Sequence, residues 1–204
     1  MKNNQNGRSM VEMLGVLAII GVLSAGGLAG YSKAMFKHKL NTTMEQITML
    51  VTNIRTMYGQ QGNYAGLATQ AVSLGIVPPV MGTSPAALTN PFKGSVQILE
   101  AMATSNTISA VNTAITGDAK PTAFVISYKG LPKEACIALA TADFGSGAGS
   151  GFIGVEIEAS TGTNYAKGKV LGADEGKPYP MGGASGTGAV ATCTEQATVS
   201  WKFY

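Results

Sequence analysis

The chain has 204 residues, of which 45% are hydrophobic and 12% are charged, and its 14 Lys and Arg against 11 Asp and Glu give a formal net charge of +3. This composition excludes a disordered chain, a collagen-like chain and a basic nucleic-acid-binding arm, so no nucleic acid partner is expected. One His and two Cys are too few for a four-ligand zinc site or for a catalytic network with a metal ligand to spare, so we expect neither an enzyme nor a cofactor.

A run of twenty residues near the N-terminus, from Met13 to Ser32, carries no charge and is bounded by Glu12 and Lys33. As a helix it would rise about 30 Å, which is the thickness of the hydrocarbon layer of a bilayer. All of its faces are apolar or small, which predicts a position in a membrane or in a core lined entirely by protein. The candidates are a secretory signal peptide, an uncleaved signal anchor and a more specialised export signal, and the continuation of the run beyond Ala25 argues against the first.

Glu12, at the start of this run, separates the remaining candidates. A carboxylate at the edge of the hydrocarbon is costly, so it needs a cationic partner and indicates a function. It is preceded by a short polar leader that contains Lys2, then by Gly7 and Arg8, and it lies five residues after Gly7. No other Gly near the N-terminus has a Glu at this offset. This arrangement of leader, Gly, Glu and apolar run resembles the class III signal of type IV prepilins.

The resemblance implies that a membrane aspartyl prepilin peptidase cuts between Gly7 and Arg8. Residues 1–7 are then the leader peptide, Glu12 is the fifth residue of the mature chain, and the new N-terminal amine is usually methylated. In a filament, Glu12 would meet the amine of Arg8 of a neighbouring subunit and set the register of assembly. The family usually begins its mature chain with an apolar residue, and Arg8 departs from that pattern. The alternative is an ordinary signal anchor, in which Glu12 is only a flanking charge.

The charges on the two sides of the apolar run do not decide its orientation. Two cations precede the run, and three follow it closely at Lys33, Lys37 and Lys39. The prepilin resemblance implies an N-terminus in the cytoplasm and a C-terminal domain outside, first in the bacterial inner membrane and then in an extracellular pilus at the cell surface. Two Cys agree with an exported domain, where a pair is usually a disulfide.

Beyond the apolar residues 8–32, residues 33–58 are expected to continue the helix as an amphipathic segment. Apolar residues recur at three- and four-residue spacing with polar residues between them; they are Leu40, Met44, Ile47, Leu50, Val51, Ile54, Met57 and Tyr58. One helix over residues 8–58 would be about 75 Å long. The alternative is two helices joined near residues 37–39, and His38 is expected to be solvated in either case.

Residues 59–204 are expected to form one α+β headgroup, an antiparallel sheet packed on the emerging helix. A short helix is predicted over residues 67–74 and another from Pro132, with strands over residues 94–101, 123–128, 152–157 and 198–204. The Gly-rich residues 145–151 and 182–188 are typical of surface loops. The GxGxxG match at residues 149–154 precedes a strand-like run instead of opening a helix, so it does not indicate nucleotide binding.

Landmarks in this headgroup extend the resemblance past the N-terminus. Residues 53–58, the Gly-Asn-Tyr at 62–64, the Gly-Leu-Pro-Lys-Glu-Ala-Cys at 130–136 and a late Cys-Thr before the last strand resemble class IVb-like major pilins of enteric and conjugative thin pili. The resemblance implies the type IV pilin fold and a disulfide from Cys136 to Cys193 that bounds residues 136–193. The alternative is two free buried thiols. The seven-residue leader is shorter than is typical of class IVb, so the subclass stays open between IVa and IVb.

The sequence therefore predicts a structural subunit of a type IV pilus that is exported, cleaved and polymerised through its N-terminal helix. Its expected partners are other copies of itself, the prepilin peptidase, an assembly ATPase with its inner-membrane platform, and the inner membrane before assembly. The alternatives are a minor pilin or type II secretion pseudopilin, and a membrane-anchored periplasmic binding domain that never polymerises. Adhesion, conjugation, DNA uptake and motility are all compatible with the sequence.

Glycines within the apolar run indicate that this helix is flexible or closely packed. Each interior Gly costs about 0.5–1 kcal/mol of helix stability relative to Ala. Close helix–helix approach is one explanation, and local unwinding between Gly21 and Gly27 on leaving the lipid is the other. Gly21, Gly26 and Gly27 are the residues at which we expect this flexibility.

Overall fold

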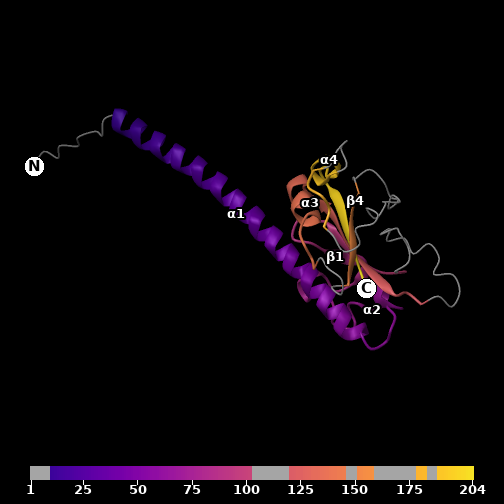
Figure 1. The fold of residues 1–204 in the computed structure, drawn as a ribbon. Coiled ribbons are helices and arrows are strands. Elements are labelled where there is room, and N and C mark those ends of the chain that lie inside the picture. Colours follow the sequence, from indigo (N-terminus) through magenta and orange to yellow (C-terminus); the bar gives the residue numbers. More distant parts are fainter. Residues whose placement is uncertain (1–9, 103–119, 146–150, 159–177, 183–187) are drawn as a thin grey trace, which may run out of the picture. The chain divides into compact units, whose positions relative to one another are not determined.

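The computed structural model describes residues 10–102, 120–145, 151–158, 178–182 and 188–204, and the chain forms two compact units, Met1–Lys39 and Leu40–Tyr204 (Figure 1). In chain order, the helices and strands are α1 (Met10–Tyr58), α2 (Leu67–Gln70), β1 (Leu88–Thr89), β2 (Ser95–Ala101), β3 (Ala123–Leu131), α3 (Lys133–Ala140), β4 (Phe152–Glu158), α4 (Ala189–Thr192) and β5 (Ala197–Phe203). Two short 3-10 turns, Pro79–Met81 and Pro85–Ala87, lie between α2 and β1.

Helix α1 is unbroken from Met10 to Tyr58, so the alternative of two helices joined near residues 37–39 is wrong. His38 is exposed, as expected. In the second unit, α1 buries one face, as the spacing predicts; the fully or almost fully buried apolar residues are Ile47, Leu50, Val51, Ile54 and Tyr58. Met57 is 44% exposed, so Tyr58 alone ends the buried stripe. The helix stops at Gly59, where a Cβ would come within 2.6 Å of the carbonyl oxygen of Arg55.

The headgroup sheet has five antiparallel strands in the order β1-β2-β3-β5-β4, so the last strand of the described chain lies between β3 and β4. The four predicted strands are confirmed, and β3 extends three residues further than expected, to Leu131. Strand β4 carries an irregularity between Phe152 and Gly154. Helix α2 ends at Gln70, earlier than predicted, and the chain continues in turns to Gly75. Strand β1 and helix α4 were not predicted, because two and four residues are too short to show a period.

One hydrophobic core joins the sheet to the buried face of α1. Alternate residues of the two central strands supply most of its aromatic rings, and each is at most 1% exposed; they are Phe124 and Tyr128 on β3, and Trp201 and Phe203 on β5. The Phe124 and Phe203 rings stack at a centroid distance of 5.4 Å, and the Tyr128 and Trp201 rings meet edge to face at 5.8 Å. The alternation of β5 therefore directs its large apolar side chains toward α1.

The opposite face of β5 is buried as well. Alternating polar residues ordinarily mark a solvated face, but Ser200 is 6% exposed and Lys202 is fully buried. The Ser200 hydroxyl lies 2.8 Å from the hydroxyl of Ser127 on β3. Burial lowers the pKa of the Lys202 ammonium. Both faces of the central strands are therefore buried. The alternation of polar and apolar residues in the sequence does not show this.

Candidate assembly site

The apolar part of α1 in the first unit is covered by no other part of the described chain. Its large hydrophobic side chains from Met10 to Leu28 are between 49% and 82% exposed. Within the residues that the structure describes, α1 is the one helix long and apolar enough to cross a membrane. An apolar surface of this extent must be buried by lipid or by other protein chains. This apolar surface is the candidate assembly site.

Glu12 lies exposed in the first turn of α1, where its negative charge interacts favourably with the positive end of the helix dipole. The predicted cleavage site, Gly7 and Arg8, lies outside the described residues. Among the residues from Met10 onward that are described, none forms an ion pair with Glu12. A cationic partner would therefore have to come from outside the described residues or from another molecule.

The glycines of the apolar helix have no packing role within the first unit. The helix runs continuously through Gly21, Gly26 and Gly27, and a Cβ added at any of these positions would meet nothing within 4 Å. The same holds for Gly15 and Gly30. Since Ala at these positions would stabilise the isolated helix by about 0.5–1 kcal/mol each, the reason for Gly must lie in the helix backbone or in another molecule.

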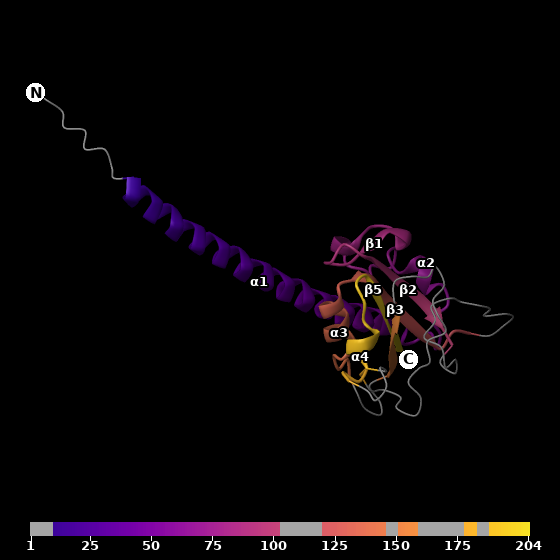
Figure 2. The ribbon, with the colours of Figure 1, turned by 90° about the horizontal axis from the view of Figure 1, so that it is seen from above.

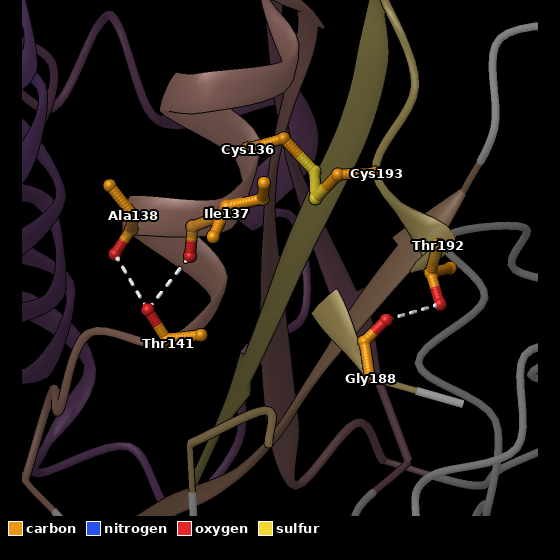
Figure 3. Close-up of a disulfide and its surroundings, with 7 residues drawn as sticks. All are labelled: Cys136, Ile137, Ala138, Thr141, Gly188, Thr192 and Cys193. Carbon is orange, nitrogen blue, oxygen red and sulfur yellow. Dashed lines mark hydrogen bonds between the residues drawn. A yellow bond between two sulfur atoms is a disulfide. The ribbon is translucent and has the colours of Figure 1, made fainter. Parts of the chain in front are cut away.

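The disulfide region of the headgroup, in the second unit, contains the cysteine pair that the sequence singled out. Cys136 on α3 and Cys193, which directly follows α4, are both buried and are joined by a disulfide, with their Cα atoms 5.9 Å apart (Figure 3). Pro132 is the N-cap of α3, one residue before the first helical residue, and Glu134 supplies an acidic side chain in the first turn. The bond ties α3 to the segment that leads into β5.

Hydrogen bonds hold the described ends of this region. The hydroxyl of Thr141 donates to the carbonyl oxygen of Ile137 at 2.8 Å, and that of Thr192 donates to Gly188 at 3.0 Å (Figure 3). The backbone N–H of Tyr179 donates to the carbonyl oxygen of Ala140 at 3.0 Å. Helices α3 and α4 also lie side by side, as both ribbon views show (Figure 2). The sequence carried no signal for α4 or for the Tyr179 contact.

Metal binding and surface grooves also bear on what the described residues can do. They contain no group of three or more His, Cys, Asp or Glu that could hold a metal ion. An open groove of about 420 Å³ between the second half of α1 and the residues after α2 has no titratable side chain in its lining; it is lined by Met49, Asn53, Val72, Gly75, Val77, Pro78, Pro79, Gly82 and Thr83. The Asn53 amide in this groove already donates to the carbonyl oxygen of Ile76 at 2.9 Å. The groove can contact another surface, but it has no group for acid–base chemistry.

Comparison with known proteins finds a matching family and two similar relatives. A family model described as Bundlin matches residues 33–203. The chain is 26% identical over 149 residues to the major structural subunit of bundle-forming pilus of Escherichia coli O127:H6 (strain E2348/69 / EPEC), covering 72% of this chain and 69% of that protein, and it matches the subunit of E. coli O111:H- to the same extent.

Two solved structures are also similar. TcpA, a type IV pilin from the Vibrio cholerae El Tor biotype, is 19% identical with a TM-score of 0.45 over 82% of this chain and 99% of that one. A type IV b pilin from Salmonella typhi is 16% identical with a TM-score of 0.44 over 79% and 97% of the two chains.

Proposed function

The chain belongs to the Bundlin family of type IVb pilins, and on this basis we propose that it is the major structural subunit of a bundle-forming type of pilus. The match of the family model to residues 33–203 carries this proposal. The family is structural and not enzymatic. Residues 10–32, which precede the matched part, supply the exposed apolar surface that polymerisation through the N-terminal helix requires.

In this function the apolar helix has two successive environments. Before assembly it lies in the lipid of the inner membrane, and after assembly it lies in the filament core among the helices of other copies. Because both environments are dry, the helix passes from one to the other with little loss of hydrophobic stabilisation. The headgroup remains in water throughout, and its disulfide suits the oxidising side of the membrane.

We further propose the following organisation of the chain. Residues 1–7 are the leader peptide, residues 8–32 the membrane and filament-core helix, residues 33–58 its amphipathic continuation, and residues 59–204 the headgroup with the disulfide-bounded region 136–193. The prepilin peptidase cuts between Gly7 and Arg8 with the N-terminus in the cytoplasm. An assembly ATPase and an inner-membrane platform then drive polymerisation into an extracellular filament.

The role proposed for Glu12 follows from its charge and its position. Burial of a carboxylate in a filament core is tolerable only beside a cation, and the N-terminal amine at Arg8 of a neighbouring copy would supply one. Such a pair sets the axial register of neighbouring subunits more than it adds net stability, because the desolvation of two charges offsets most of their attraction. The exposure of Glu12 in the first turn of α1 supports this role.

Sheared filaments test the proposal. Filaments removed from cells should contain this chain as their most abundant protein, and mass spectrometry should find Arg8 at its N-terminus. A minor pilin or a pseudopilin would be scarce in such filaments. A chain that stays in the membrane fraction while filaments form without it, or that retains Met1 or begins after Ala25, would overturn the proposal.

A further inference from the structure

Two exposed lysines follow the apolar run of α1 directly. Lys33 and Lys37 are four residues apart, so their side chains leave the same face of the helix. Both are exposed, and both lie in the first compact unit. Lys39 differs from them, because it is half-buried and already makes an interaction. Lys33 and Lys37 form what we call the lysine pair.

The length of the apolar run places the lysine pair at a definite depth in a bilayer. From Glu12 to Lys33 the helix rises about 30 Å, which matches the hydrocarbon thickness with one charge at each edge. The hydroxyl of Ser32 donates to the carbonyl oxygen of Leu28 at 2.8 Å, so Ser32 needs no water. Tyr31 is 66% exposed and belongs to a residue type enriched at membrane interfaces. Lys33 is therefore the first side chain at this end that requires a polar environment.

The lysine pair also fits the thickness of the headgroup layer. A bilayer about 40–45 Å thick with about 30 Å of hydrocarbon leaves a layer of lipid headgroups roughly 5–8 Å thick on each side. Lys37 lies about one helical turn, about 6 Å, beyond Lys33. Both ammonium groups therefore reach the layer that holds the lipid phosphates, and their charge is complementary to it.

We propose that Lys33 and Lys37 bind anionic phospholipid headgroups in the outer leaflet of the inner membrane while the subunit awaits assembly. The inference rests on the proposed function, because it concerns the membrane-inserted subunit with its N-terminus inside. Cations on the outer side run against the usual bias of Lys and Arg toward the cytoplasmic side, and anionic lipid gives them a favourable partner there. Each lysine beside an anionic surface strengthens attachment about five-fold, and the pair about twenty-five-fold.

This attachment has a consequence for assembly. The lysine pair holds the outer end of the helix at the lipid headgroups. Glu12 is therefore held at the inner edge of the hydrocarbon, about 30 Å away along the helix. The lipid contacts are lost when the subunit leaves the bilayer for the filament. The anionic lipid content of the outer leaflet therefore regulates how readily a subunit is withdrawn.

Energy transfer between the subunit and labelled lipid tests the proposal. The full chain, with a donor dye on an introduced Cys at exposed Asn41, is reconstituted in phosphatidylcholine vesicles of which about one third is phosphatidylglycerol. The acceptor is a trace of either lipid labelled on its acyl chain. We expect transfer to phosphatidylglycerol to exceed transfer to phosphatidylcholine several-fold and to fall as salt is raised, because the attraction is electrostatic.

The deciding comparison is between two double variants of the same charge. K33Q with K37Q should abolish the preference for phosphatidylglycerol. K93Q with K133Q, which removes two exposed lysines from the globular unit of the protein, should preserve it. An unchanged preference in the first variant, an equal loss in both variants or no preference in the parent chain would overturn the proposal. The readout needs no polymerisation, so any of these results leaves the pilin function standing. Failure of the parent chain to resist alkaline extraction from the vesicles would instead count against the membrane-inserted state itself.

Discussion

Removal of the disulfide should destabilise the headgroup by an amount that the structure allows us to calculate. Cys136 and Cys193 are 57 positions apart, and the chain-entropy relation for a closed loop of this length gives about 4 kcal/mol at 25 °C. In a unit of this size 1 kcal/mol shifts the midpoint of thermal unfolding by about 2–4 °C. Replacement of both residues by Ala should therefore lower the midpoint by roughly 8–16 °C.

Trp201 provides the assay. It is the only Trp of the chain and is fully buried in the headgroup core, so its fluorescence reports unfolding of the headgroup even when α1 stays helical in detergent micelles. Because both sulfur atoms are buried, the Ala variant also loses packing. Wild-type protein in reductant separates the two effects, since it loses the bond and keeps the atoms. T194A, at an exposed neighbour of Cys193, is the matched control and should leave the midpoint unchanged.

The result that would refute the reasoning is a loss of less than about 1 kcal/mol on reduction, because the constraint on the unfolded chain would then be negligible. Alkylation gives an independent check. Without reductant, exported protein should show no labelled thiol at either cysteine.

Three further changes have defined outcomes. Glu12→Ala should insert and be processed but fail to form filaments, because it cannot pair with the amine of a neighbouring copy; normal piliation, counted by electron microscopy, would exclude a role in register. Gly26→Ala with Gly27→Ala should impair filament assembly more than membrane insertion, and a filament map with unbroken helical density between Gly21 and Gly27 would contradict local unwinding. Tyr128→Phe removes a buried hydroxyl that has no hydrogen-bond partner among the described residues. The free energy of unfolding near neutral pH should therefore stay the same or rise by up to about 2 kcal/mol. Burial raises the pKa of Tyr128, so the folded state holds this proton more tightly and wild-type stability falls as the pH rises above about 10. The advantage of the Phe variant should therefore grow above that pH in denaturant titrations, and a constant difference would contradict the reasoning.

The features that could be predicted from sequence depend on near neighbours in the chain. The apolar run from Met13 to Ser32 specifies a helix that must avoid water, whatever follows it. The spacing of Ile47, Leu50 and Ile54 depends only on the helical period, and the structure buries all three. Alternation along residues 198–204 predicted a strand, and the structure buries its alternate residues Val199, Trp201 and Phe203 in the core. The motif around Glu12 is likewise local, because it consists of residue types at fixed offsets.

Only the tertiary structure decided how these elements combine. The central place of β5 between β3 and β4 depends on pairing between segments about 40 to 80 residues apart along the chain, such as Glu158 with Thr198 and Ser127 with Ser200. Burial of Lys202 follows from the covering of the second face of the sheet, and no short-range pattern encodes it. The sequence determined which segments are helical, extended or apolar, because those properties arise from local geometry and side-chain chemistry. Strand order, the buried polar face and the placement of α4 came from the tertiary structure, because they arise from contacts that exist only once the chain has folded.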